Sequence, residues 1–387
     1  MKPRRLEPTL REVASYYPVV SLTGPRQSGK STLTRGAFPD LPRRSLEAPD
    51  IRLYAREDPR GFLAELRAGA IIDEVQHAPE LLSYLQEEVD RDPTPGRFIL
   101  TGSEHLSVSS RVAQSLAGRA GVLHLLPLSW DELGGFGAAH RDLFATMWAG
   151  GYPRIHDVGI PPPRWLGDYT ANYVQRDVRQ LLNITDLDTF TAFLKLCAGA
   201  TGQEINLSRL GADAGITANT AKAWLSVLEA SFICFRLPAW TPNIRKQVVK
   251  APKLHFFDSG LACHLLGIRT SAELRHHPLR GALFESWVAS EVYKHRVHRG
   301  ERPDLWHHRQ SRSVEVDIID RLAGVAVEVK SGATIVPETA ANLAESLAKL
   351  PESLAGRIVY GGDESRTMHG VDLCAWRDLA DRYTSGA

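Results

Sequence analysis

The sequence contains few cysteines, and their positions exclude small domains that are stabilised by zinc or by disulfides. Only four occur among 387 residues, at Cys197, Cys234, Cys263 and Cys374, and no two of them form a CxxC pair. Such spacing gives neither a zinc-ligand pattern nor a disulfide framework. We therefore expect four buried, reduced thiols.

Net charge and long apolar runs are also missing. The 46 Lys and Arg residues nearly balance the 45 Asp and Glu residues, so the net charge is +1 and no global field attracts nucleic acid. No run approaches the roughly 18 apolar residues of a membrane-spanning helix. The first residues, MKPRRLEPTLREV, lack the apolar core of a signal peptide. We expect a cytoplasmic protein without membrane contact, in which any basic site is local.

Residues 1–155 alternate strand-like and helix-like patterns. The stretch APELLSYLQEEVDR (78–91) has helical character. Apolar, β-branched runs around it end in polar or glycine residues: YYPVVSLTG (16–24), AGAIIDEVQ (68–76) and GRFILTGS (96–103). Apolar strands that alternate with helices are typical of a parallel sheet covered on both faces, so we predict an α/β domain.

Residues 156–270 predict a mostly helical domain. The segments GGYPR (150–154) and IPPPR (160–164) lie near its start, and their glycines and prolines are typical of a linker. Within the domain, residues 205–240 give a short helix, a glycine-containing turn, a second helix that begins near Thr217, and two β-like runs. This order is typical of a winged helix-turn-helix.

Residues 271–387 predict a second α/β domain. The expected elements are a helix at 281–296, strands near 304–309, 313–320 and 324–330, a helix at 337–350 and a strand at 356–361.

The sequence GPRQSGKST (24–32) matches the phosphate-binding pattern G-x-x-x-x-G-K-[ST]. Its glycines let backbone N–H groups curl around phosphates, and the helix that follows adds its positive amino end. We expect Lys30 to reach the β- and γ-phosphates of ATP and the Ser31 hydroxyl to bind Mg²⁺. The predicted nucleotide-binding residues are Gly24, Pro25, Arg26, Gln27, Ser28, Gly29, Lys30, Ser31 and Thr32.

The run AIIDEVQ places acidic residues at the end of a buried strand. Asp73 is positioned to hold Mg²⁺ through water, and Glu74 to polarise the attacking water. Thr101 and Ser103, in ILTGS, lie at the tip of another strand, where a hydroxyl can sense the γ-phosphate. An ordinary strand-to-loop turn is the alternative for this pair.

Hydrolysis also needs positive charge against the transition state. Arg119 is the preferred candidate to contact the γ-phosphate, either in its own subunit or across an interface. Arg111 and Arg176 are the other candidates, and a solvated surface position is the alternative for each arginine.

The stretch VEVDIIDRLAGVAVEVKSG (314–332) carries carboxylates and a lysine on neighbouring β-like runs. Period-2 alternation puts Glu328 and Lys330 on one face, with Asp317 on the preceding run and Glu285 on the preceding helix. Mg²⁺-dependent phosphodiester cleavage requires hard oxygen ligands beside a lysine, so Asp317 and Glu328 are candidate metal ligands. This order of elements resembles the restriction-endonuclease-like fold and its PD-(D/E)xK site. A domain that holds DNA without cutting it, or a half-buried hairpin with charges on its wet face, are the alternatives.

Positive charge is concentrated between Thr241 and Arg312, with 13 Lys and Arg against 6 Asp and Glu. Such a region can bind DNA phosphates with strong salt dependence and little sequence readout. The candidate nucleic-acid-binding residues, all in NIRKQVVKAPK (243–253), are Arg245, Lys246, Lys250 and Lys253. The second helix of the helix-turn-helix has a single cation, Lys222, so sequence-specific reading is doubtful. The aromatic residues nearby are better explained as core than as base-stacking groups: Trp287, Tyr293 and Trp306.

In this order, the motifs resemble a large group of bacterial and archaeal ATP-binding proteins. In that group an AAA-type P-loop domain precedes a domain of originally unknown function, with a winged helix and a restriction-endonuclease-like end. The resemblance spans almost the whole chain through GPRQSGKST, IIDEVQ, FILTGS, SLAGR, GGYP, FFDSGLACHLLG, GALFESWV, EVDIID and VEVKSG. It implies ATP binding and hydrolysis, and assembly of several copies into a ring, such as the hexamer of many AAA-type ATPases.

Our primary hypothesis is a Mg²⁺-dependent ATPase that acts on DNA, such as branched or broken DNA, as a homo-oligomer. Lys30, Glu74, Thr101 and Arg119 would serve hydrolysis, while the carboxylates of the last domain grip or cut DNA. The alternative is a nucleotide-gated signalling or scaffold ATPase with a protein partner and an inactive nuclease-like domain. A metabolite kinase is disfavoured because it leaves residues 165–387 without a role.

Overall fold

The computed structural model describes residues 2–103, 115–137, 142–174, 186–241, 250–311, 314–350 and 352–384. The chain divides into two compact units. Unit 1 comprises Met1–Pro127, Ala230–Phe232 and Arg296–Glu301. Unit 2 comprises Leu128–Glu229, Ile233–His295 and Arg302–Ala387.

Unit 1 is built on a parallel sheet whose order, among the described residues, is β2-β3-β4-β1-β5. The three apolar runs form the central strands, so the predicted parallel sheet is confirmed. The edge strands β2 and β5 were not predicted, because their sequences RRS and AGVLH lack a continuous apolar run. The strands are β1 (Val19–Thr23), β2 (Arg43–Ser45), β3 (Ala70–Asp73), β4 (Phe98–Gly102) and β5 (Ala120–His124).

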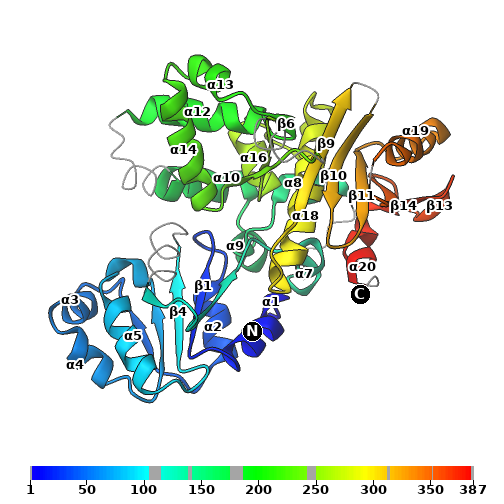
Figure 1. Cartoon of the computed structure of the whole chain (residues 1–387). Helices are drawn as coiled ribbons and strands as arrows, with labels where there is room; N and C mark the ends of the chain where they lie inside the picture. Colours follow the sequence, from blue (N-terminus) through cyan, green and yellow to red (C-terminus); the bar gives the residue numbers. More distant parts are fainter. Residues whose placement is uncertain are drawn as a thin grey trace. The chain divides into compact units, whose positions relative to one another are not determined.

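Helices cover both faces of this sheet, as the blue and cyan ribbons of Figure 1 show. Side chains of β4 alternate between the two faces because successive residues of a strand point in opposite directions. Phe98 and Leu100 belong to one core cluster and Ile99 to the other. One face carries α1 (Leu6–Ala14) and α2 (Lys30–Ala37); the other carries α3 (Pro49–Glu57), α4 (Pro59–Ala64) and α5 (Leu81–Arg91).

The first half of unit 2 is mostly helical, as predicted. A helix, a turn and a second helix follow one another as expected, and β7 comes after them. The small sheet, of order β6-β8-β7, differs from the expected pair of runs, because β6 precedes both helices and β8 begins only at Lys253. The sheet consists of β6 (Gln203–Glu204), β7 (Cys234–Leu237) and β8 (Lys253–Phe256). The helices are α7 (Trp130–Gly135), α8 (Leu143–Ala149), α9 (Pro153–Val158), α10 (Pro162–Tyr169), the π-helical turn η2 (Thr170–Val174), α12 (Leu187–Gly199), α13 (Leu207–Asp213), α14 (Ala218–Ala230), α16 (Ser259–Leu265) and α17 (Ser271–His276).

The predicted linker at GGYPR and IPPPR is wrong. Pro153 and Pro162 begin helices α9 and α10, where proline is favoured because the first helical N–H needs no partner. The glycines are also fixed, since the Gly151 N–H donates to Asp258 Oδ2 at 2.7 Å. The prolines therefore mark helix starts within a packed unit.

The second half of unit 2 contains the predicted helix, strands, helix and strand in order, beginning with α18 (Arg280–His298). Its sheet, among the described residues, has the order β13-β14-β12-β11-β10-β9. Strands β10 and β11 are antiparallel, whereas β11 and β12 are parallel and are joined through α19. The elements are β9 (Leu305–Ser311), β10 (Val314–Asp320), β11 (Val325–Lys330), α19 (Pro337–Ala348), β12 (Ala355–Tyr360), β13 (Arg366–Met368), β14 (Val371–Ala375), the 3₁₀ turn η3 (Trp376–Asp378) and α20 (Leu379–Thr384).

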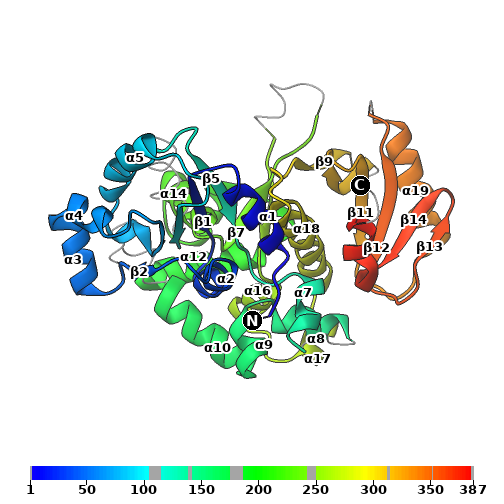
Figure 2. The same cartoon turned by 90° about the horizontal axis from the view of Figure 1, so that it is seen from below.

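Helix α19 lies along one face of this sheet, and Figure 2 shows it beside β14, β12 and β11. Its buried Ala340 and Leu343 pack with Val316, Ile358 and Leu373 in one core cluster. The elements after β12 were not predicted, because short polar strands such as RTM carry little periodic signal.

Two expectations about the chain as a whole can be compared with this fold. All four cysteines are buried and unpaired, as predicted. In the part of the chain that the structure describes, no helix combines the length and apolarity needed to cross a bilayer.

Candidate functional site

The segment 24–32 forms a loop between the end of β1 and the start of α2. Gly24 and Gly29 adopt φ angles of +152° and +97°, which favour glycine. A Cβ atom on Gly24 would also overlap the carbonyl oxygen of Leu125. Since α2 begins at Lys30, its amino end and its free N–H groups lie at this loop. Such an arrangement binds anions, phosphates in particular.

Lys30 lies over the loop that it follows. Its Nζ donates to the carbonyl oxygens of Gly24 and Pro25, each at 2.9 Å, and the residue is 6% exposed. The loop itself therefore holds the ammonium group beside the amino end of α2. A phosphate oxygen there can replace the carbonyl acceptors.

Arg4 supports the loop from outside the motif, and sequence reasoning missed it. Its guanidinium donates to the carbonyl oxygens of Ser28 at 2.7 Å and Leu126 at 2.8 Å, and the residue is buried. Because a buried charge left without partners is costly, these contacts fix the loop to the end of the sheet. The sequence MKPRRLEP gives no signal that distinguishes Arg4 from its neighbour Arg5.

Asp73, the last residue of β3, is brought next to the loop. The Ser31 hydroxyl donates to both carboxylate oxygens at 3.0 Å, and the Thr101 hydroxyl and the Arg43 guanidinium also donate to this carboxylate. Burial alone would raise the pKa of Asp73, but these hydrogen bonds outweigh it and the pKa is lowered. The carboxylate is therefore charged at neutral pH.

Ser31 and Asp73 are oxygen ligands of the type that Mg²⁺ prefers. Within the described residues, no group of three or more His, Cys, Asp or Glu side chains is placed to hold a metal ion. A site with few protein oxygens fits Mg²⁺ in nucleotide-binding proteins, where phosphate oxygens and water complete the coordination. The residues present therefore fit this cofactor.

Glu74 adopts a left-handed backbone conformation with φ +58°, which is uncommon for a residue other than glycine. Gln76 Nε2 donates to the Glu74 carboxylate and, at 3.0 Å, to Ser103 Oγ. Ser103 Oγ in turn donates to Glu74 Oε2 at 3.3 Å. Ser103 is thus a partner of Glu74, and Gln76, which sequence reasoning missed, joins the two.

Arg119 does not lie at this site. It precedes Ala120, which pairs with Val19 at the start of β1, whereas the loop follows Thr23 at the other end of that strand. Arg119 is held there by Asp90, with 2.9 Å between Nη2 and Oδ2. The expectation that Arg119 contacts the γ-phosphate of its own subunit is therefore wrong. Arg111 and Arg176 lie outside the described residues.

In unit 2 the structure brings together the four residues predicted from the C-terminal motif, and it adds Lys253 and Glu315. Lys253 Nζ lies 2.9 Å from Glu285 Oε1, 3.0 Å from Asp317 Oδ1 and 3.4 Å from Glu315 Oε1. Lys330 Nζ lies 2.5 Å from Glu328 Oε1. We call these six residues the carboxylate cluster: Lys253, Glu285, Glu315, Asp317, Glu328 and Lys330.

Burial dominates the titration of this cluster. It raises the pKa of Glu285 to about 8 and that of Glu328 to about 7, with the negative charge of Asp317 as the second cause in each case. Lys253 has a raised pKa, because the charges of Asp317 and Glu285 outweigh its burial. The ammonium of Lys253 is therefore charged. Near neutral pH, Glu285 is mostly protonated and Glu328 is partly protonated.

The expected basic surface is only partly described. Arg245 and Lys246 lie outside the described residues, and Lys250 is exposed, with its Nζ 3.0 Å from the carbonyl oxygen of Arg309. Lys253 is only 3% exposed in the carboxylate cluster, so the prediction that it binds nucleic acid at a surface is wrong.

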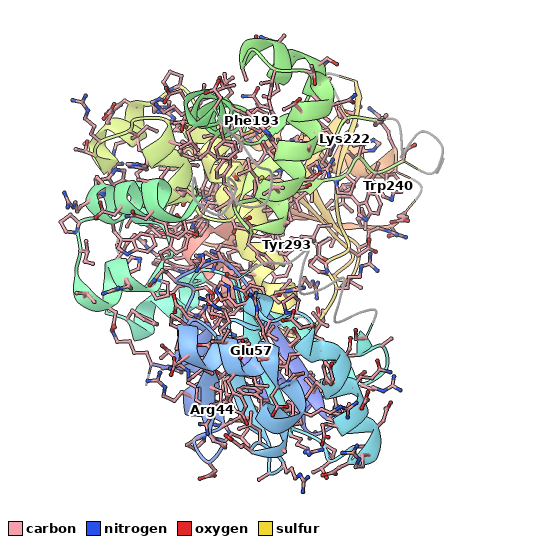
Figure 3. All side chains as sticks on the ribbon, turned by 90° about the vertical axis from the view of Figure 1, so that its left-hand side faces the viewer. Arg44, Glu57, Phe193, Lys222, Trp240 and Tyr293 are labelled. Atoms are coloured by element: carbon pink, nitrogen blue, oxygen red, sulfur yellow. The ribbon has the colours of Figure 1, made fainter. Side chains whose placement is uncertain are left out.

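The aromatic residues of this region are packed inside unit 2. Trp287 is 5% exposed, and the Tyr293 ring lies 4.9 Å from that of Phe235 and 5.0 Å from that of Phe257. Figure 3 labels Tyr293 together with Lys222 of α14, which is exposed. The interpretation as a core residue is confirmed for Trp287, whereas Tyr293 and Trp306 are half-buried.

Three family models match the chain in succession. An AAA domain family matches residues 16–134, a family described as a domain of unknown function (DUF8612) matches 140–272, and a second such family (DUF4143) matches 280–378. The loop geometry and the first match together define unit 1 as an AAA-type P-loop ATPase domain.

Similar proteins include the uncharacterized proteins Rv2008c of Mycobacterium tuberculosis and Mb2031c of Mycobacterium bovis. Each is 28% identical over 365 residues, which covers 92% of this chain and 79% of the relative. Among solved structures, the Walker-type ATPase PABY2304 of Pyrococcus abyssi is 18% identical, with a TM-score of 0.49, over 68% of this chain and 96% of its own. A signal transduction ATPase (STAND) protein of Pyrococcus horikoshii is 14% identical, with a TM-score of 0.24, over 75% of this chain and 45% of its own.

Proposed function

We propose that the chain is a Mg²⁺-dependent ATPase that acts on DNA, with unit 2 as the part that holds the nucleic acid. One observation carries the proposal for unit 2. Glu285 of α18, Asp317 of β10, and Glu328 and Lys330 of β11 converge at one point of a sheet in which β10 and β11 are antiparallel and β12 is parallel. This is the arrangement expected of a restriction-endonuclease-like domain.

In unit 1 the chain's own residues divide the work of hydrolysis. The loop amides and Lys30 bind the phosphates, and Lys30 balances the charge that develops on them. Glu74, held by Gln76 and Ser103, orients the attacking water. Thr101 and Ser31 hold the Asp73 carboxylate in place through hydrogen bonds. Mg²⁺, held by Ser31 and Asp73, would neutralise phosphate charge when bound.

In unit 2, exposed cations support the proposal that DNA is held through its phosphates without base readout. Lys250 and Arg309 are both exposed, and Lys250 Nζ donates to the carbonyl oxygen of Arg309. The cations of 242–249 precede them in the chain. The described face of α14 offers Lys222 as an exposed cation. We therefore propose binding that depends on DNA structure and salt more than on sequence.

Arg119 supports a proposal about assembly. Because it lies at the opposite end of β1 and β5 from the phosphate loop, it can serve hydrolysis only in a neighbouring subunit. We propose a homo-oligomer, such as a hexameric ring, in which each subunit presents Arg119 to the next.

ATP turnover tests the proposed function. It is measured with saturating duplex, single-stranded and branched DNA, and without DNA. We expect at least one form to stimulate turnover, and the stimulation to fall as salt is raised. Lys250→Ala should reduce the stimulation, while Lys349→Ala, an exposed lysine of the last α/β half, should not. Turnover that is indifferent to every DNA form would remove DNA from the proposal.

The second candidate is a nucleotide-gated switch whose partner is a protein. The burial of Lys253 within the carboxylate cluster favours it, since this lysine is removed from the basic surface. Indifference of turnover to DNA would support this candidate.

A further inference from the structure

The Lys253 ammonium occupies the centre of the carboxylate cluster. Its Nζ lies within 3.4 Å of carboxylate oxygens from three residues, Glu285, Glu315 and Asp317. A protonated lysine has three N–H donors and no acceptor. Lys253 Nζ donates to Glu285 Oε1 and to Asp317 Oδ1, and it forms a third ion pair with Glu315. The side chain is buried, and its ammonium faces carboxyl groups of three different residues.

The second oxygen of Asp317 is also engaged. Asp317 Oδ2 accepts the backbone N–H of Val329 at 3.0 Å, while Oδ1 accepts from Lys253. Glu328 is paired with Lys330 at the edge of the cluster. Thus the two residues expected to be metal ligands, Asp317 and Glu328, each already face a cation of the chain itself.

A divalent metal does not fit this arrangement. It would need charged carboxylate oxygens at about 2.0–2.6 Å, at the point where the Lys253 ammonium now lies. The metal and the ammonium would then repel each other strongly in a buried environment.

The two histidines beside Lys253, His255 and His307, are buried as well. His255, two residues further along β8, is fully buried, and burial together with the Lys253 charge lowers its pKa well below the usual range. For His307, burial, with the Lys253 charge second, lowers the pKa to about 4. Both imidazoles are therefore neutral, and Lys253 supplies the positive charge at the centre of the carboxylates.

We propose that Lys253 is the resident cation of this nuclease-like site, so that unit 2 binds no divalent metal there and holds DNA without cutting it. Lys253 comes from β8, whereas its partners come from α18 and β10. Its ion pairs therefore also tie the small sheet that follows α14 to the C-terminal sheet. The inference rests on the nuclease-like arrangement proposed above, but its test reads metal binding and is independent of DNA binding and ATP turnover.

The test measures Mn²⁺ binding to the full-length protein without nucleotide, by electron paramagnetic resonance of the free ion. We expect no tight Mn²⁺ binding by the wild type. Lys253→Ala should gain one site, with an affinity at least about tenfold higher, because a unit charge so near the metal changes binding by more than this factor. The added substitution Asp317→Asn should remove the site again, and Lys349→Ala, which changes an exposed lysine outside the cluster, should behave as the wild type.

A stability measurement guards against a variant that folds poorly. Lys253→Ala leaves buried carboxylates unpaired, so its Tm should fall, and millimolar Mn²⁺ should restore part of that loss while leaving the wild-type Tm unchanged. Lys253→Met/Glu285→Gln, which removes the ammonium together with one ionisable carboxyl group, should recover stability without Mn²⁺ binding. Tight Mn²⁺ binding by the wild type that Glu328→Gln abolishes would overturn the proposal. A folded Lys253→Ala protein without a Mn²⁺ site would overturn it as well.

Discussion

Asp73 in unit 1 and Asp317 in unit 2 are both buried aspartates beside a candidate metal site, yet different donors surround them. Asp73 accepts hydrogen bonds from two hydroxyls and from Arg43, whose side chain is 35% exposed. Asp317 accepts from Lys253, which is 3% exposed.

The difference teaches that an acidic motif alone does not define a metal site. A carboxylate whose partners are neutral hydroxyls and a solvent-accessible arginine keeps a charge that a cation from solution can use. A carboxylate whose partner is a buried ammonium already has its cation.

The phosphate loop should give the largest effect. Lys30→Ala removes the charge that the loop holds beside the amino end of α2, and we expect ATP turnover to fall by about a thousandfold or more. Steady-state phosphate release measures it, with Lys349→Ala as the lysine control. Wild-type turnover in Lys30→Ala would remove the phosphate-loop assignment.

Glu74→Gln should separate binding from hydrolysis. The amide keeps the size and hydrogen bonds of the side chain but cannot accept a proton, so turnover should drop by about a hundredfold. ATP affinity, measured by calorimetry, should stay within a fewfold of the wild-type value. An equal loss of both would show that Glu74 supports the loop instead of the water.

The two sites should respond to pH with opposite sign. Burial gives Glu285 a folded-state pKa of about 8, well above its ordinary value, so the folded state keeps a proton that the unfolded chain releases. The free energy of unfolding of unit 2 should therefore fall, by at least about 1 kcal/mol, as pH rises from 5 to 8.5. Asp73 has a lowered pKa, so its contribution is instead lost as pH falls.

Tryptophan fluorescence isolates this pH effect, because all eight tryptophans belong to unit 2: Trp130, Trp148, Trp165, Trp224, Trp240, Trp287, Trp306 and Trp376. Denaturant titrations at several pH values give the free energy, and Glu285→Gln should flatten the dependence. A stability of unit 2 that rises between pH 5 and 8.5 would contradict the assignment.

Arg4→Ala should have the smallest effect of the four. It removes two hydrogen bonds that hold the loop, so ATP affinity should weaken by about tenfold while turnover at saturating ATP changes little. Arg11→Ala is the matched control, since Arg11 is exposed on α1 and pairs with Glu7. Equal behaviour of the two variants would leave Arg4 without a role in nucleotide binding.

The sequence was sufficient to predict the central secondary-structure elements of both units. Apolar runs such as AIIDEVQ and VAVEVK predict buried strands, and the fixed spacing of Gly24, Gly29 and Lys30 predicts the phosphate loop. In each case one local pattern determines one local structure, so no knowledge of distant contacts is needed. The central strands of the parallel sheet and the order of elements around the carboxylate cluster followed from such patterns.

Contacts between distant segments were beyond this reasoning. Lys253 follows a basic run, and nothing in its neighbourhood in sequence indicates that it meets Glu285 and Asp317, which lie 32 and 64 residues further along the chain. Arg4 likewise reaches Leu126, 122 residues away. Arg119 was misplaced for a related reason. Its closeness to β4 in sequence does not tell that it lies at the start of β5, at the edge of the parallel sheet opposite the phosphate loop.

One reaction tests the account most directly. Wild-type protein is incubated with ATP, Mg²⁺ and a supercoiled plasmid, and phosphate release and plasmid integrity are followed in the same tube. We predict that the plasmid accelerates ATP consumption and stays uncut throughout. ATP consumption that ignores the plasmid, or Mg²⁺-dependent nicks that disappear in Glu328→Ala, would contradict the account.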